Sequence, residues 1–374
     1  GNVVINGNAS SVDSTITGGI GADTLTAGSG NDTIDGGAGN DTIEGAAGND
    51  TITGGEGDDI ITDSAGDDTI TSGAGADQIN SADGNDTIDA GAGNDTITFD
   101  TDAYLDKNDT VDGGEGIDTV ELGIDTDLAD AFTLTNVEKV ELTSTSTNLT
   151  SLDMVNVASL TEITIANGSD AGYTISNIKD GVSIKNLETD ALALVIDTVD
   201  AATITLDAQA NAHGSSSFTV TDATTVNLTT TATAAATYDL DAVALDTLDT
   251  TTLNITGATT SSVAFTADVI TNTNALQAVT MTTTTSGATA AISTIVDADA
   301  LTSLTVNGEY ANATIGAIGG SGSAEALATI TLNASNASTV HIDGDITADT
   351  TNSTTDNAMV LTADIGTSSE VEVD

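Results

Sequence analysis

The sequence predicts an all-β protein, with a parallel β-roll over residues 1–121 followed by an irregular Thr-rich β-solenoid over residues 122–374. The first observation is a nine-residue motif that repeats nine times without a gap over residues 18–98. The second is a set of short alternating apolar and polar stretches that recur every 20–27 residues in the second part. Periods of these lengths are typical of chains that wind into stacked coils.

The repeat has the frame G-G-x-G-x-D-x-U-x, where U is Leu or Ile. Its fourth position is always glycine, its sixth always aspartate and its eighth always a branched aliphatic residue. Three invariant columns over nine copies are a specific signal of a repeat architecture. The sixth-position residues are the candidate metal ligands Asp23, Asp32, Asp41, Asp50, Asp59, Asp68, Asp77, Asp86 and Asp95.

Each repeat combines a turn with a strand. Positions 1 to 6 are rich in Gly, Asn and Asp, which tolerate tight turns and positive φ. Positions 7 to 9 read Thr-Ile-Thr or similar, a short strand with one apolar residue facing inward. Two repeats then close one coil of 18 residues, so every second repeat stacks in parallel. The prediction places Asp23 over Asp41 and Asp32 over Asp50.

Stacked carboxylates repel one another unless a cation lies between them. Carboxylate and carbonyl oxygens without His or Cys form a hard ligand set, which suits Ca²⁺ better than Mg²⁺ or Zn²⁺. A metal-free solenoid, whose aspartates only cap turns, would leave these columns self-repelling. We therefore expect about seven or more Ca²⁺ ions, with seven between the pairs Asp23/Asp41, Asp32/Asp50, Asp41/Asp59, Asp50/Asp68, Asp59/Asp77, Asp68/Asp86 and Asp77/Asp95.

This array resembles the RTX family of secreted calcium-binding repeats, closely over residues 18–98 and less well over 9–17 and 104–121. Residues 9–17 carry Ser14 at the aspartate position, and five residues, 99–103, are inserted after the ninth copy. A degenerate repeat with Asp109 and a good one with Asp118 follow. The resemblance implies that the sixth-position aspartates, with Asp109 and Asp118, and turn carbonyls bind calcium. It also implies folding only with calcium and export of the unfolded chain by type I secretion.

Some repeats depart from the frame, and we expect weaker calcium binding there. The second glycine is replaced by Ala46, Ser64 and Ala82, and the first by Asp63, Ser72 and others. Asp100, Asp102, Asp106 and Asp109 cluster around the insertion, where they predict either an extra calcium site or a solvated acidic loop. The loop is favoured, because Leu105 stands where an EF-hand loop requires glycine.

The composition restricts the partners. The chain has 58 acidic residues, four lysines and no arginine, for a net charge of −54. Such a surface excludes direct binding to nucleic acid. Seven Ca²⁺ ions would add +14 and leave about −40, so further divalent ions are expected on the surface. Cysteine is absent, and calcium is expected to supply the stability that disulfides give other secreted proteins. No apolar run is long enough for a membrane span.

The second part, residues 122–374, is rich in threonine and poor in lysine. Parallel solenoid coils are favoured there, and β-sandwich domains are the alternative. A short helix is considered near 292–301 or 322–329. Composition and architecture resemble bacterial surface-layer (S-layer) proteins of the RTX-secreted type. The strands are predicted around the equivalent apolar residues Val140, Ile163, Ile184, Ile204, Val226, Leu253, Val279, Leu304 and Ile330.

The sequence predicts a non-enzymatic protein. It contains neither H-E-x-x-H nor G-x-S-x-G, and its two histidines, His213 and His341, are isolated in sequence. The leading hypothesis is a secreted structural protein of the bacterial cell surface that self-assembles through calcium into an S-layer. Its partners would be further copies of itself, in a lattice or filament, and cell-surface polysaccharide bound through calcium. The alternatives are a segment of an RTX adhesin or matrix filament, and the carrier portion of a secreted RTX enzyme.

Overall fold

The computed structural model of the chain consists of β-strands joined by turns. No helix long and apolar enough to cross a membrane occurs in the part of the chain that it describes. The described residues are 1–7, 11–100, 105, 108–123, 132–143, 150–167, 172–186, 193–199, 203–208, 212–221, 223–229, 237–245, 252–257, 264–272, 276–283, 289–296, 301–309, 312–318, 329–335, 339–342, 360–365 and 370–373.

The chain forms two compact units, Gly1–Ser169 and Asp170–Asp374. Each unit is a parallel β-solenoid, and all described strand pairs are parallel. This arrangement confirms the predicted solenoid and excludes the β-sandwich alternative, because sandwiches are built from antiparallel sheets. The boundary expected from composition at 121/122 stays a prediction.

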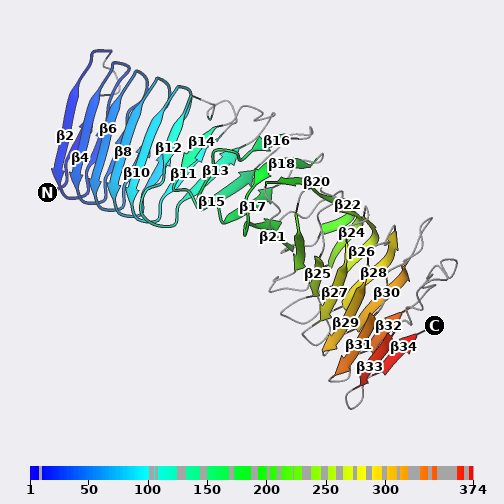
Figure 1. The fold of residues 1–374 in the computed structure, drawn as a ribbon. Helices are drawn as coiled ribbons and strands as arrows, with labels where there is room; N and C mark the ends of the chain where they lie inside the picture. The colour runs from blue at the N-terminus through cyan, green and yellow to red at the C-terminus, as the bar shows by residue number, and fades with distance from the viewer. Residues whose placement is uncertain are drawn as a thin grey trace. The chain divides into compact units, whose positions relative to one another are not determined.

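In the first unit, successive strands alternate between two sheets (Figure 1). One sheet contains β1 (Val4–Asn6), β3 (Thr24–Thr26), β5 (Thr42–Glu44), β7 (Ile60–Thr62), β9 (Gln78–Asn80), β11 (Thr96–Phe99), β13 (Thr119–Gly123), β15 (Lys139–Thr143) and β17 (Glu162–Asn167). The other contains β2 (Thr15–Ile20), β4 (Thr33–Ala38), β6 (Thr51–Glu56), β8 (Thr69–Ala74), β10 (Thr87–Ala92), β12 (Thr110–Asp112) and β14 (Thr133–Thr135). Strand β16 spans Thr150–Asp153.

The register confirms the predicted coil of 18 residues. Thr24 pairs with Thr42 and Thr33 with Thr51, so each residue lies beside the one 18 positions later. After the five-residue insertion the offset becomes 23, as Thr87 pairs with Thr110. The eighth-position aliphatic residues form the core, each at most 1% exposed: Leu25, Ile34, Ile43, Ile52, Ile61, Ile70, Ile79, Ile88 and Ile97.

The insertion after the ninth repeat contributes to this core. Phe99 ends strand β11, is fully buried and pairs with Leu122 of β13. Leu105, just after the insertion, is also fully buried. The inserted segment therefore adds apolar packing and leaves the next coils in register.

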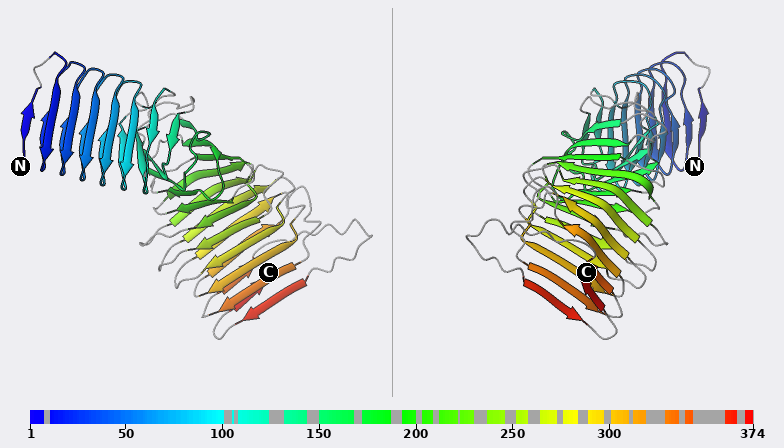
Figure 2. Two further views of the ribbon diagram at one scale, coloured as in Figure 1. Left: turned by 60° about the vertical axis from the view of Figure 1, so that its left-hand side comes forward. Right: turned by 90° about the vertical axis from the view of Figure 1, so that its right-hand side faces the viewer.

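In the second unit, strands again alternate between two sheets (Figure 2). One contains β19 (Ser183–Asn186), β21 (Thr203–Ala208), β23 (Thr225–Thr229), β25 (Thr252–Gly257), β27 (Ala278–Thr283), β29 (Ser303–Glu309), β31 (Thr329–Ser335) and β33 (Val360–Ile365). The other contains β18 (Tyr173–Ile178), β20 (Ala193–Thr198), β22 (Ala212–Thr221), β24 (Thr237–Leu245), β26 (Ala264–Asn272), β28 (Thr289–Val296), β30 (Asn312–Ile318), β32 (Thr339–Ile342) and β34 (Glu370–Val373).

The predicted column of apolar residues is confirmed from Ile204 onward, where Ile204 pairs with Val226 and Val226 with Leu253. It is wrong at one step, because Ile184 pairs with Leu206 instead of Ile204. Both candidates point inward from the same strand, so period-two alternation cannot distinguish them.

The helix considered near 292–301 is wrong over its first part, since residues 292–296 belong to strand β28, which pairs with β26 and β30. Backbone pairing on both sides overrides the helix propensity of this Ala-rich stretch. The other segment considered, 322–329, lies almost wholly outside the described residues.

Two separate constraints favour glycine at the second position of the repeat, a positive φ and close contact between coils. Gly19 and Gly55 both have positive φ, 113° and 122°. A Cβ added at Gly19 would meet nothing within 4 Å, whereas one at Gly55 would overlap the carbonyl oxygen of Gly37 in the preceding coil. The positive φ thus favours glycine at both positions. At Gly55 the close approach of the preceding coil also requires it.

We predict that Gly55→Ala lowers the melting temperature of the calcium-loaded chain more than Gly19→Ala does. Both changes strain the backbone by about 1–3 kcal/mol, but only Gly55→Ala also forces two coils apart. Thermal unfolding in saturating calcium, followed by circular dichroism, measures the difference. Equal losses for the two variants would show that close stacking at Gly55 is unimportant.

Candidate calcium sites

The sixth-position aspartates form two columns, one on each edge of the roll. In each column the backbone N–H of one aspartate donates to Oδ1 of the aspartate one coil later. These N···Oδ1 distances are 2.7 Å for Asp23 to Asp41, 2.7 Å for Asp32 to Asp50 and 2.8 Å for Asp41 to Asp59. The predicted pairs are therefore true neighbours. One column contains Asp23, Asp41, Asp59, Asp77, Asp95 and Asp118, and the other Asp32, Asp50, Asp68, Asp86 and Asp109.

The second oxygen of most of these carboxylates has no partner. All eleven aspartates are at most 3% exposed. Among the described residues, Oδ2 is buried without a hydrogen bond in Asp23, Asp41, Asp50, Asp59, Asp77, Asp95 and Asp118. A buried, unsatisfied carboxylate oxygen is unfavourable unless a proton or a metal ion balances it.

Where the first position of a repeat is glycine, it leaves space for a ligand beside this oxygen. A Cβ added at Gly36 would lie 2.5 Å from Asp41 Oδ2 and 2.6 Å from the carbonyl oxygen of Gly54, one coil later. A Cβ at Gly18 would likewise meet Asp23 Oδ2 and the carbonyl oxygen of Gly36. Carboxylate and carbonyl oxygens thus converge on one small volume between coils. This donor set fits the predicted calcium ion.

Two sites differ because another group satisfies the second oxygen. Asp32 Oδ2 accepts from the backbone N–H of Gly28 at 3.1 Å. Asp86 Oδ2 accepts from the hydroxyl of Ser81 at 2.5 Å. The candidate sites are therefore chemically unequal, although the repeat sequence makes them look alike.

Both columns extend beyond the nine repeats. Ser14 N donates to Asp32 Oδ1 at 2.6 Å, so the degenerate first repeat still joins the stack. Asp86 and Asp95 donate to Asp109 and Asp118 at 2.7 and 2.9 Å. Asp118 N in turn donates to Glu138 Oε2 at 2.9 Å, where a glutamate takes the place of the next aspartate. Sequence reasoning missed Glu138, because it lies outside any recognisable repeat.

A second, exposed ladder runs beside the buried one, and sequence reasoning missed it too. Here the fifth-position side chain accepts from the backbone N–H one coil later, as in Asn49 N to Asn31 Oδ1 at 3.0 Å and Asn85 N to Asp67 Oδ1 at 3.0 Å. The available signal was the excess of Asn and Asp at position 5, which has Asn31, Asn40, Asn49, Asp58, Asp67, Asn85 and Asn94.

The metal-free columns are electrostatically unfavourable. Burial, opposed by the backbone hydrogen bond and reinforced by the neighbouring aspartates, raises the pKa of Asp50, Asp59 and Asp95 to about 6. Burial also raises the pKa of Asp41, Asp86 and Asp118. At neutral pH the empty roll would thus hold stacked anions in a poorly solvated interior.

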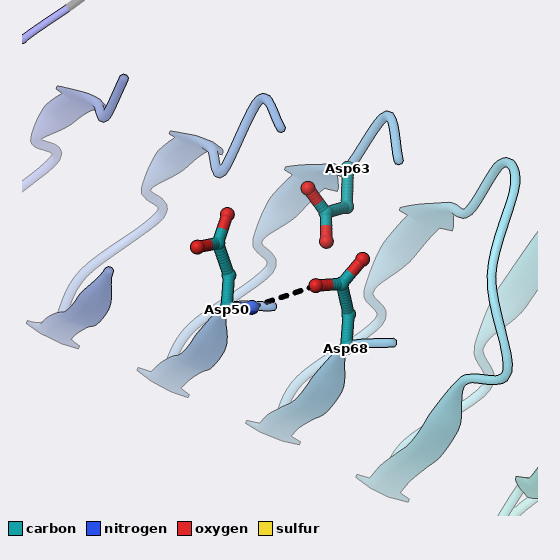
Figure 3. A group of neighbouring side chains, drawn as sticks. All are labelled: Asp50, Asp63 and Asp68. Carbon is teal, nitrogen blue, oxygen red and sulfur yellow. Dashed lines mark hydrogen bonds between the residues drawn. The ribbon is translucent and has the colours of Figure 1, made fainter. Parts of the chain in front are cut away.

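Asp63 joins one of these sites although it is not a sixth-position residue. It replaces the first glycine of its repeat, is 2% exposed, and lies with Asp50 and Asp68 so that oxygens of the three carboxylates are within 4.8 Å of one another (Figure 3). Burial and the neighbouring carboxyl group of Asp68 raise the pKa of Asp63 to about 9. In the sequence, Asp63 stood out only as a replacement of the first glycine of its repeat.

The other residues that the sequence singled out lie around the insertion and in the second unit. Asp102 and Asp106 lie outside the described residues, so the choice between an extra site and an acidic loop around 100–109 stays open. Asp109, expected in that cluster, belongs to the column through its bond from Asp86. His213 and His341 lie in strands β22 and β32.

Comparison with known proteins supports calcium binding by the first unit. The model of the RTX calcium-binding nonapeptide repeat matches residues 17–52, 44–79, 53–88, 73–103 and 105–129. No curated protein and no solved structure matches the chain. The chain therefore carries RTX calcium-binding repeats folded as a β-roll, and proteins with such repeats are typically secreted.

We predict that Asp41→Ala raises the calcium concentration needed to fold the roll by roughly threefold to tenfold, because it removes a ligand oxygen and the acceptor of Asp23 N–H. Asp41→Asn keeps an acceptor for that N–H but loses the charge, so it should still raise the midpoint. Circular dichroism during calcium titration measures both. The control is Asp58→Asn, which removes the same negative charge at an exposed position. Identical midpoints for Asp41→Asn and the control would exclude Asp41 as a ligand.

We also predict that the calcium-free roll is more structured in mild acid than at neutral pH. The folded pKa of Asp50, Asp59 and Asp95 lies above the unfolded value, so protonation favours folding below about pH 4 and this stability is lost as pH rises through about 6. Circular dichroism in excess chelator should show more β-structure at about pH 5 than at about pH 8. A chelated chain equally disordered at both values would contradict the buried columns.

Proposed function

We propose that the chain is a non-enzymatic structural protein of the bacterial cell surface, which folds on binding calcium and assembles through calcium into an S-layer. The observation that carries this proposal is the pair of buried aspartate columns with unpartnered oxygens, in a chain whose net charge is −54. Calcium acts at two levels, first inside the roll and then between subunits.

Inside the roll, calcium compensates for a small apolar core. One coil buries two Leu or Ile side chains, which contribute roughly 3–6 kcal/mol. Ordering 18 backbone residues costs roughly 18–36 kcal/mol, and each ladder hydrogen bond returns only about 1 kcal/mol net. The buried carboxylates add repulsion. An ion that binds only the folded roll contributes its binding free energy to folding.

Between subunits, calcium compensates for like charge. The chain has four lysines against 58 acidic residues, so few ion pairs can form between two copies. Even with seven ions bound, a charge of about −40 makes copies repel over a Debye length of about 8 Å. Divalent ions that coordinate carboxylates from both copies remove this repulsion and can form a bond that screening by monovalent salt cannot. The same bridging would attach the layer to acidic cell-surface polysaccharide.

Two further functions are compatible with a calcium-loaded solenoid. A stalk segment of an RTX adhesin or matrix filament would use the same parallel coils as a stiff spacer. The carrier portion of a secreted enzyme would use the roll for export and folding. The sequence offers neither a zinc-protease nor a lipase motif, which favours a structural role.

We predict that the purified chain stays monomeric in chelator and forms ordered arrays or filaments when about millimolar calcium is restored, a concentration in the range of extracellular calcium modules. Sodium chloride of equal ionic strength should not replace calcium, because it screens charge without coordinating carboxylates. Light scattering and electron microscopy measure assembly. A chain that folds in calcium but stays monomeric at high concentration would favour the stalk or carrier function, and assembly in sodium chloride with chelator would contradict the calcium bridge.

A further inference from the structure

Asp63 differs from every other first-position residue of the nine repeats. The others are glycine, alanine or serine: Gly18, Ala27, Gly36, Gly45, Gly54, Ser72, Ser81 and Ala90. Only at residue 63 does the turn place a carboxylate in the space that glycine otherwise leaves beside a column aspartate. This carboxylate is buried, since Asp63 is only 2% exposed.

The backbone holds Asp63 in the regular stack. Its N–H donates to the carbonyl oxygen of Asn80 at 2.9 Å, and its Oδ1 accepts from Ser64 N at 2.9 Å. The other oxygen, Oδ2, is buried and has no hydrogen-bond donor. The side chain is therefore fixed at one oxygen and unsatisfied at the other.

Carboxylate oxygens from two coils face the same small volume beside Gly45. A Cβ added at Gly45 would lie 2.6 Å from Asp63 Oδ1 and 2.9 Å from Asp50 Oδ2, so a larger residue there would displace these carboxylates. Asp50 Oδ2 also lacks a hydrogen bond. Asp68 is held to Asp50 by the 2.7 Å bond from Asp50 N to Asp68 Oδ1, drawn dashed in Figure 3. Three carboxylates thus converge, two of them with a buried oxygen that no donor satisfies.

The next coil shows how the same place is filled without excess charge. Ser81 stacks one coil after Asp63, and its hydroxyl donates to Asp86 Oδ2 at 2.5 Å. There a neutral donor satisfies the column aspartate. At Asp63 a carboxyl group takes the place of this hydroxyl, so a proton or a cation has to balance the three carboxyl groups. Among the described residues this is the one cluster of three or more potential metal-binding side chains.

We propose that Asp50, Asp63 and Asp68 form a three-carboxylate calcium site that binds more tightly than the other sites of the roll and retains its ion longest as calcium is withdrawn. The inference rests on the proposed calcium-dependent folding and deepens it. Calcium affinity in oxygen sites rises with ligand charge and rigidity. The site joins two coils in the middle of the array, so at low calcium it holds a nucleus from which coils can add in both directions.

The test counts calcium ions bound to the full chain by equilibrium dialysis against calcium buffers, with folding followed in parallel by circular dichroism. The parent should show one ion bound about tenfold or more tightly than the rest. Asp63→Asn, which keeps the shape, and Asp63→Gly, which restores the repeat, should both abolish that tight site. Asp67→Asn removes one exposed negative charge on the same edge and should leave it unchanged.

The outcomes separate this inference from the proposed function. A tight site that survives in both Asp63 variants, or a parent whose ions all bind alike while folding still requires calcium, would overturn the three-carboxylate site only. Asp63 variants that bind calcium as the parent does, and destabilise the chelated chain, would show that Asp63 and Asp68 share a proton instead. A parent that folds fully in chelator would overturn the calcium-dependent folding itself.

Discussion

The hydrogen bond from each column aspartate N–H to the carboxylate one coil later fixes the rest of the roll. It sets the 18-residue register, as in Asp23 to Asp41, and brings successive aspartates into contact. Because Oδ1 is committed to this bond, Oδ2 is left facing the interior beside the first glycine of the repeat. One interaction therefore produces both the regular stack and the row of unsatisfied oxygens that needs cations. The glycines follow from it, since coils held this closely leave no room for a Cβ at positions such as Gly55.

Different interactions offset the conformational entropy lost on folding in the two units. In the first unit, most strands of the nine repeats contribute one aliphatic residue to a thin core, and we propose that ions between the coils supply the missing stability. In the second unit, longer strands such as β26 and β29 contribute more backbone pairing. Neutral side-chain ladders assist there, as in Asn254 Nδ2 to Asn227 Oδ1 at 2.9 Å and Asn333 Nδ2 to Asn307 Oδ1 at 2.7 Å. Calcium sensitivity is thus expected to be concentrated in the first unit.

Substitutions within the repeat make the candidate sites chemically different from one another. Ser81 satisfies its neighbouring aspartate with a neutral donor, whereas Asp63 adds a third carboxylate at the equivalent place one coil earlier. Glu138 extends a column with a longer acid after the repeats have ended. Such substitutions make a chemically uniform array into sites of different charge.

The sequence by itself determined the coil length, the alternation of sheets, the aliphatic core and the two aspartate columns, because three invariant positions at a period of nine admit one way of stacking. It also located the insertion, which shifts the register from 18 to 23 residues. Only the tertiary structure decided which carboxylate oxygen is hydrogen-bonded and which is free, that Asp63 points into the site of Asp50, and that Ile184 pairs with Leu206. The reason is that a repeat pattern assigns residues to faces and coils. The direction of a side chain, and a two-residue shift along one face, depend on contacts between coils that are distant in sequence.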